Sequence, residues 1–137
     1  MNEIIDEIKD IISWYKDLPI DYTGITELMY QRIQLVTLMS YYSSELGNYR
    51  IQWKNCEAET ESVRRSIVKE RLDMGEALSK SQAYGKFYSI DQYVSEKRFD
   101  GAYNQMKFFY DSTNAIIDAM NQHISNLKRE QDQTKIM

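Results

Sequence analysis

A long heptad repeat is the feature that most constrains how this chain can fold. If Ile25 is taken as position a, the a and d positions over residues 25–74 are almost all apolar or aromatic. A repeat of this length is typical of a helix that packs against other helices along its whole length. It predicts one helix over residues 24–78, about 80 Å long at about 1.5 Å per residue. The a and d positions are Ile25, Leu28, Arg32, Leu35, Met39, Tyr42, Leu46, Tyr49, Trp53, Cys56, Thr60, Val63, Ile67, Glu70 and Met74.

A helix of that length does not fit inside one compact globule, because a compact monomer of this size has a radius of gyration of only about 14 Å. Either the helix breaks, at Gly47 or Gly75, or other helices cover its apolar stripe, some of them from other subunits. The chain has one proline and five glycines, too few turn residues for a β-rich fold. We therefore expect an all-α fold, in which long heptad-patterned helices form a helical hairpin that assembles into an oligomer.

The other segments complete a single helical domain over residues 1–137. An acidic N-terminal helix is expected within 1–18, because isoleucines recur there at three- and four-residue steps and Pro19 follows. Residues 79–90 are small and polar around Gly85, which indicates a connector. A C-terminal helix with a broad apolar face is expected over 91–130, followed by a frayed tail over 131–137.

The net charge of −4 is unevenly distributed along the chain. Residues 1–61 carry a net charge of −6, residues 62–98 carry +3, and the remainder carries −1. A ligand responds to the local field of the surface that it approaches, and not to the total charge. An anionic partner would therefore bind the middle of the chain.

The basic run in this middle segment has two interpretations. Arg64 and Arg71 share one helix face, whereas Arg65 and Lys69 share another. Side chains of this kind neutralise phosphates and give salt-sensitive, sequence-independent binding. The alternative is an ordinary solvated helix surface on which Glu61 pairs with Arg65, and charge alone favours it. The run continues with Lys80 and Lys86.

Tyrosine is abundant, with eleven residues in the chain. Those on the helical stripes, such as Tyr42 and Tyr110, are explained by core or interface packing. Tyr84, Tyr88 and Tyr93 lie in or beside the expected connector and remain open to stacking on unpaired bases, which contributes about 1–3 kcal/mol per base.

No arrangement of residues predicts an active site. His123 is the only histidine and has no cysteine near it, so a zinc site would need carboxylates to complete it. Cys56 lies on the heptad stripe as a small core residue, and a lone cysteine suits a reducing compartment. We expect no enzymatic activity, no cofactor and no metal. Because no signal peptide or apolar span is evident, we expect a cytoplasmic location.

Two short strings in the C-terminal half resemble a known family. Lys69, Arg71, Leu72 and Asp73 form a K-x-R-L-D string, and a softer segment that contains serines follows it. The last helix carries Ser112, Ala115, Ile117, Asp118, Ala119 and Met120. Together these strings resemble the UvsY-type recombination mediators of T4-like bacteriophages over residues 62–128. The strongly acidic first helix departs from that family.

The resemblance implies a ring-forming helical protein without a catalytic site. Such a protein binds single-stranded DNA and helps to load a RecA-like recombinase in place of a single-strand binding protein, in the host cytoplasm if it is phage-encoded. Lys69 and Arg71 match the family's basic pair and inherit its DNA-contact role. The other candidate contacts are Arg64, Arg65, Lys80, Lys86 and Tyr84. The apolar stripes would supply oligomer contacts at Leu46, Tyr49, Trp53, Phe109, Ile116 and Met120.

A second interpretation is a purely structural helical protein, such as a scaffold or coiled-coil adaptor in phage or bacterial assembly. It explains the heptad repeat equally well and the acidic total better. It does not explain why basic residues cluster at 62–98.

Overall fold

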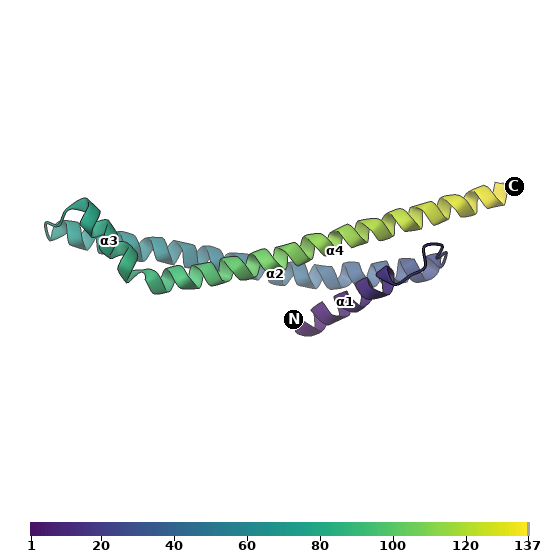
Figure 1. Cartoon of the computed structure of the whole chain (residues 1–137), viewed down its shortest axis with the longest axis horizontal. Helices are drawn as coiled ribbons and strands as arrows, with labels where there is room; N and C mark the ends of the chain where they lie inside the picture. The colour runs from purple at the N-terminus through teal and green to yellow at the C-terminus, as the bar shows by residue number, and fades with distance from the viewer. Residues whose placement is uncertain (137) are drawn as a thin grey trace. The chain divides into compact units, whose positions relative to one another are not determined.

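The computed structural model describes residues 1–136 and is all-α, which confirms the predicted fold class. Its helices are α1 (Asn2–Lys16), α2 (Ile25–Asp73), α3 (Leu78–Tyr88) and α4 (Ile90–Ile136) (Figure 1). The heptad register is also confirmed, because every a and d position of α2 from residue 25 to residue 67 is buried or half-buried. α2 packs against α4, as expected for a helical hairpin.

The described residues divide into two compact units, and α2 and α4 each contribute to both of them. Unit 1 is Met1–Glu45 together with the chain from Lys107 onward, and unit 2 is Leu46–Met106. The physical reason is length, because α2 has 49 residues and α4 has 47. A helix of about 50 residues is about 75 Å long, more than one small core can cover. α1 covers one stretch of the pair, and α3 lies against the other.

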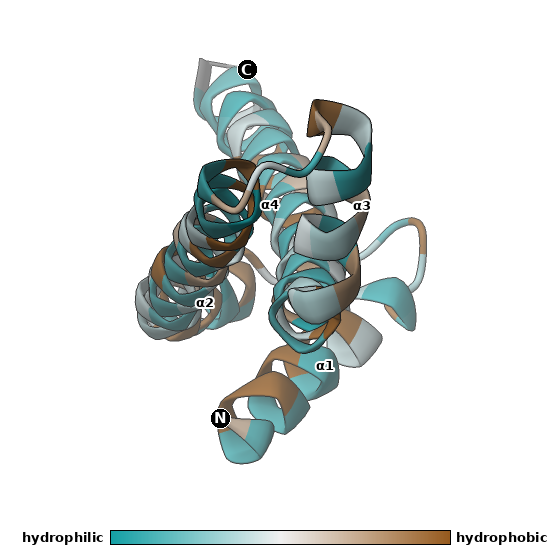
Figure 2. Ribbon diagram, turned by 90° about the vertical axis from the view of Figure 1, so that its left-hand side faces the viewer, coloured by the Kyte–Doolittle hydropathy of each residue, from teal (hydrophilic) through white to brown (hydrophobic). Residues whose placement is uncertain are grey.

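In unit 1, α1 packs on the first part of α2 and the last part of α4 (Figure 1), and its Trp14 and Tyr15 contact the cluster that these two helices form. Ile8 is completely buried, as are Leu28 and Met120. Burial of one such side chain contributes about 1.5–3 kcal/mol. Figure 2 shows apolar and polar residues on different sides of α1, as this docking requires. The residues around the cluster of Leu28, Ile124 and Leu127 are Trp14, Tyr15, Leu18, Tyr22, Ile25 and Met29.

Aromatic pairs join α2 to α4 in unit 2. The ring centroids of Tyr49 and Phe99 lie 6.4 Å apart, and those of Trp53 and Tyr103 lie 5.7 Å apart with the planes 23° from parallel. Such pairs contribute about 0.5–1.5 kcal/mol beyond the burial of their area. The tyrosines of the helical stripes therefore pack in the core here, as the sequence predicts.

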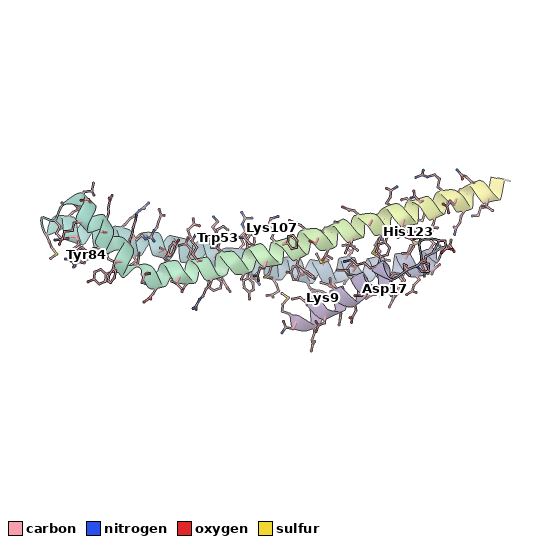
Figure 3. All side chains as sticks on the ribbon, viewed as in Figure 1. Lys9, Asp17, Trp53, Tyr84, Lys107 and His123 are labelled. Carbon is pink, nitrogen blue, oxygen red and sulfur yellow. The ribbon has the colours of Figure 1, made fainter. Side chains whose placement is uncertain are left out.

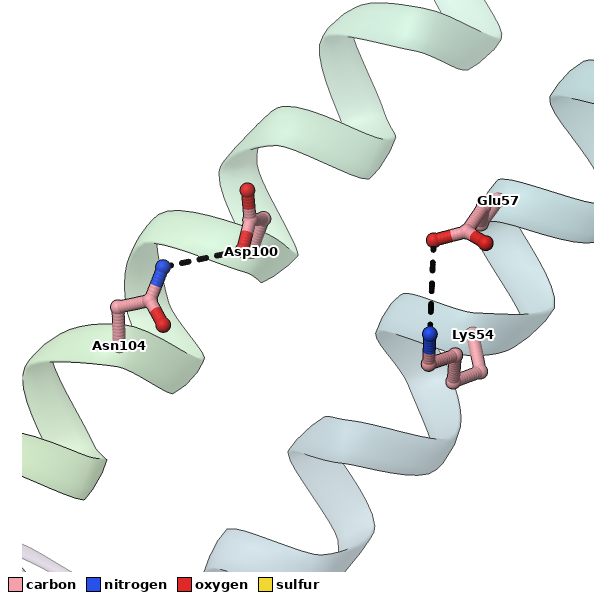
Figure 4. A network of polar contacts seen from close by, with 4 residues as sticks. All are labelled: Lys54, Glu57, Asp100 and Asn104. Carbon is pink, nitrogen blue, oxygen red and sulfur yellow. Dashed lines mark hydrogen bonds and ion pairs between the residues drawn. The ribbon is translucent and has the colours of Figure 1, made fainter.

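The outer surfaces of α2 and α4 in unit 2 carry polar pairs within each helix. Lys54 Nζ lies 3.7 Å from Glu57 Oε2, and Asn104 donates a hydrogen bond of 3.0 Å to Asp100 (Figure 4). Exposed pairs of this spacing stabilise a helix by only about 0.2–0.5 kcal/mol each. They mark solvated surface and not a site.

The segment predicted as a connector over 79–90 is largely a helix, α3. Its small residues lie at four-residue spacing on one face, and Ser81, Gly85 and Ser89 are all buried. A Cβ atom at Gly85 would lie 2.9 Å from Val68 Cγ2 and 3.3 Å from the carbonyl oxygen of Arg64. These residues are small because α3 approaches α2 closely, and not because the chain is a loop.

α2 runs through Gly47 without a break and ends at Asp73, before the predicted end at residue 78. Gly75 has a φ of +87°, which glycine adopts without strain. The Gly75 N–H donates to the carbonyl of Leu72 at 2.9 Å, and the Glu76 N–H donates to that of Arg71 at 3.1 Å. This pair of bonds is a Schellman motif, which ends the helix and satisfies its last carbonyls.

The predicted frayed tail over residues 131–136 instead continues α4. Thr134 Oγ1 donates a hydrogen bond of 2.9 Å to the carbonyl of Glu130 within this last stretch. Once a helix is nucleated, each added residue gains a backbone hydrogen bond, so extension needs no apolar periodicity. Residue 137 of the predicted tail lies outside the described residues.

Candidate nucleic-acid interface

A basic hollow lies between α2 and α3 in unit 2. Its volume is about 570 Å³. Four of its lining side chains are cationic and one, Asp73, is anionic, while two apolar residues, Val68 and Leu72, also line it. The cationic residues are Arg64, Arg65, Lys69 and Lys86. The structure therefore brings four of the predicted contact residues together around one opening.

Each arginine of this basic hollow has a partner. Arg64 Nε donates a hydrogen bond of 2.9 Å to Ser89 Oγ, and its guanidinium carbon lies 5.3 Å from the centroid of the Tyr93 ring. One bond uses one of the five N–H donors of the guanidinium, so most of its capacity is not used by Ser89. Arg65 pairs with Glu61 at 3.5 Å, which confirms the predicted ion pair. Both of these side chains are more than two-thirds exposed, so water screens the pair and it is weak.

The lysines of the basic hollow have a simpler environment. Lys69 and Lys86 are both exposed. Within residues 1–136 neither of them forms an ion pair. Their ammonium groups can therefore neutralise an incoming anion without breaking an existing contact.

Arg71 lies away from the basic hollow. Its Nη1 is 3.3 Å from Glu76 Oε1, and its guanidinium carbon lies 3.9 Å from the centroid of the Tyr84 ring. Residues two apart point to different sides of a helix, so Lys69 and Arg71 do not converge. With only 27% of its side chain exposed, Arg71 ties the end of α2 to α3.

A second hollow of about 400 Å³ lies along α3 on the side of Tyr84, which Figure 3 labels. The Tyr84 and Tyr88 rings are parallel within 5°, with centroids 5.7 Å apart, and the Phe87 ring is perpendicular to that of Tyr88 at 5.1 Å. Phe87 is 67% exposed and Tyr88 is 54% exposed. We call these three rings the α3 aromatic cluster. Lys80 lines the same hollow.

Phe87 was not among the residues predicted from the sequence. The available signal was the string Lys86, Phe87, Tyr88, in which a cation precedes two aromatic residues. Only the position of Phe87 on the outer side of α3 distinguishes it from a core residue.

The residues predicted as oligomer contacts are at least partly covered within the chain. In unit 2, Tyr49 and Trp53 contact Phe99 and Tyr103, and Leu46 is half-buried. In unit 1 the predicted residues Phe109, Ile116 and Met120 are half-buried or buried, and Phe109 packs on Tyr42 at 5.2 Å. Met120 is completely buried, so its side chain is covered without a second copy. The oligomer remains a prediction.

His123 anchors the connection between α1 and α2 in unit 1 (Figure 3). Its Nε2 lies 3.1 Å from the carbonyl oxygen of Tyr22, and its Nδ1 lies 3.5 Å from the Tyr15 hydroxyl. A carbonyl only accepts, so Nε2 donates to Tyr22, and the hydroxyl donates to Nδ1 when the ring is neutral. Burial raises the pKa of the Tyr15 hydroxyl, which keeps it protonated for this role.

Neither a metal-binding cluster nor a membrane-spanning helix occurs among the described residues. Among residues 1–136, no three His, Cys, Asp or Glu side chains lie close enough together to hold a metal ion. Within the same residues, no helix combines the length and the apolar character needed to cross a bilayer.

Comparisons of this chain with protein-family models, with curated proteins and with solved structures found no match.

Proposed function

We propose that this protein is a recombination mediator that binds single-stranded DNA through unit 2. The basic hollow carries the proposal, because it places the cations of Arg64, Arg65, Lys69 and Lys86 around one opening. Phosphates of a strand lie against these cations and displace counterions. None of the four reads base edges, so binding is independent of sequence.

Weak binding by each chain suits a protein that must transfer the DNA strand to another protein. Four cations neutralise at most four phosphates, and each phosphate contributes a salt slope of about −0.7 for single strands. One chain therefore binds weakly at physiological salt. Several copies assembled into a ring bind the same strand more tightly, because later contacts are intramolecular.

The loading role comes from the resemblance to the UvsY-type family. The K-x-R-L-D string supports it, because Lys69, Leu72 and Asp73 of that string line the basic hollow. In this role the protein displaces a single-strand binding protein and receives a RecA-like recombinase on the same DNA. No chemistry at the strand is required of it, so the proposed function is not enzymatic.

Substitution of Arg65 and Lys69 by glutamine tests the proposal. We expect weaker binding of a labelled oligothymidylate and a salt slope lower by about 1.4, because two phosphate contacts of about 0.7 each are lost. The measurement is fluorescence anisotropy at several salt concentrations, with a duplex of equal length for comparison. Lys54→Gln is the matched control, since Lys54 is an exposed lysine of α2 outside the basic hollow.

An unchanged salt slope in the double variant would place the phosphates elsewhere. Failure of the folded, oligomeric wild type to bind any strand at low salt would favour the structural scaffold instead.

One observation already favours that second function. α2 carries no charged residue over positions 33–44, and it exposes four large side chains in unit 1. They are Tyr30, Ile33, Val36 and Tyr41.

A further inference from the structure

We infer that the α3 aromatic cluster is a subsite for unpaired nucleobases, separate from the basic hollow that takes the phosphates. This inference rests on the proposed function. It adds that one side of α3 receives the phosphates and the other side receives the bases. Phe87 supplies the ring on which a base stacks, and Tyr84 and Tyr88 support it.

The geometry of the rings prepares a stacking platform. Arg71 lies over the Tyr84 ring at 3.9 Å, and the Tyr88 ring is parallel to that of Tyr84. These contacts restrict the two tyrosines before any ligand arrives, so little side-chain entropy is lost on binding. Phe87 contacts Tyr88 edge-on and keeps 67% of its surface exposed. A base can therefore stack on the exposed Phe87 ring, which lies beside tyrosine rings that are already held in place.

The charge around the α3 aromatic cluster selects the occupant. α3 carries Lys80 and Lys86 and no acidic residue. Glu76, which precedes α3, is paired with Arg71. The charged residue that lines the hollow of this cluster is Lys80, and apolar rings beside a cation complement a ligand that is itself aromatic and carries negative charge. A strand of nucleic acid has both properties, because each of its aromatic bases is attached to a phosphodiester backbone.

The two hollows lie on opposite flanks of α3. Its buried edge is Ser81, Gly85 and Ser89, and the residues just after these positions, Gln82 and Lys86, line the basic hollow. The residues just before Gly85 and Ser89, namely Tyr84 and Tyr88, line the second hollow, with Lys80 at the start of the same side. A strand that crosses α3 therefore leaves the basic hollow at Lys86, passes Phe87 and meets Lys80.

This arrangement accounts for a preference for single strands. In a duplex each base is stacked and paired, so its face is not available to Phe87 unless the base is extruded at a cost of a few kcal/mol. Every base has an aromatic face, so the subsite tolerates any sequence. Phosphate contacts alone do not distinguish the two forms in this way.

The test compares a labelled oligothymidylate with a strand of the same length made of abasic sugar phosphates. We expect the wild-type protein to bind the thymidylate at least about tenfold more tightly, because only that strand supplies bases to stack. Phe87→Leu removes the ring but keeps an apolar side chain. We expect it to remove most of this base-dependent difference while the affinity for the abasic strand and the salt slope stay unchanged. Phe87→Tyr should restore the difference.

The matched control is Phe108→Leu, since Phe108 is 75% exposed on α4 and belongs to unit 1. Equal affinity of the wild type for both strands would overturn the inference, as would Phe87→Leu binding the thymidylate as well as wild type. Loss of binding to anionic vesicles in Phe87→Leu, with DNA binding intact, would assign the cluster to a membrane surface and also overturn it. The proposed function fails by a different result, namely that the folded, oligomeric wild type binds no strand at low salt.

Discussion

Lys69 and Arg71 are two residues apart in α2, yet their surroundings differ. Lys69 is exposed at the basic hollow, whereas Arg71 is held by Glu76 and by the ring of Tyr84. The resemblance assigns both residues a DNA contact. Their geometry separates them into a phosphate contact and a positioning residue that fixes α3.

Substitution of Arg71 by alanine is expected to destabilise unit 2 by about 1–3 kcal/mol. Glu76 Oε2 is already buried without a partner, so removal of Arg71 leaves the whole carboxylate unpaired in a half-buried site. Urea denaturation followed by the fluorescence of Trp53, in a Trp14→Phe background, measures the loss. The salt slope for single-stranded DNA should stay at the wild-type value.

Addition of Glu76→Gln to the Arg71 variant provides the control. A neutral amide is cheaper to leave unpaired than a carboxylate, so the double variant should recover part of the lost stability. If Arg71→Ala instead lowers the salt slope by about 0.7 without a loss of stability, Arg71 is a phosphate contact after all.

At the scale of one element, α3 depends on its small face. Gly85→Val should separate α3 from α2, because even a Cβ atom at that position lies 2.9 Å from Val68 and 3.3 Å from a backbone oxygen. We expect faster hydrogen exchange of the α3 amides and weaker binding of single-stranded DNA, since both hollows use α3.

Gly47→Ala is the matched control within unit 2. A Cβ atom at Gly47 meets no atom within 4 Å, and the residue lies inside α2. The substitution should therefore stabilise the protein by about 0.5–1 kcal/mol through helix propensity. Equal effects of the two substitutions would show that the close approach of α3 is not needed.

α3 also contains the residues whose role the sequence alone does not predict. The heptad positions of α2 and the isoleucines of α1 could be assigned because their period depends on local spacing alone. The role of the small residues Ser81, Gly85 and Ser89 could not be assigned in this way, because small residues occur both in loops and in close helix contacts. Only the position of Val68 in the structure decides between the two. The four cations of the basic hollow were found from charge, but Phe87 required knowledge of the outer side of α3.

At the scale of the whole molecule, the long helices α2 and α4 each run through both compact units. A helix as long as α2 was predicted either to break at Gly47 or Gly75 or to be covered by other helices, some of them from other subunits. α1 and α3, together with the pairing of α2 and α4, supply much of this cover within the chain. The surface left for other copies in unit 1 is the uncharged stretch of α2 that exposes Ile33 and Tyr41.

We expect the wild-type protein to sediment as an oligomer. The double variant that combines Ile33→Lys and Tyr41→Lys should sediment as a smaller species. A lysine within an apolar interface would be an unpaired buried charge, which costs several kcal/mol. Sedimentation velocity over a range of concentrations measures the change, and Ser125→Lys on α4 serves as the control. A wild-type protein that stays monomeric throughout this range would contradict the prediction.

The continuity of α2 and α4 has a consequence for attempts to dissect this protein. The chain passes from unit 1 to unit 2 between Glu45 and Leu46 and returns between Met106 and Lys107, and both passages lie inside helices. Proteases cut exposed chain outside helices, which occurs here over residues 17–24 and 74–77. Limited digestion would therefore trim α1 or open the turn before α3, and it would not release either unit whole.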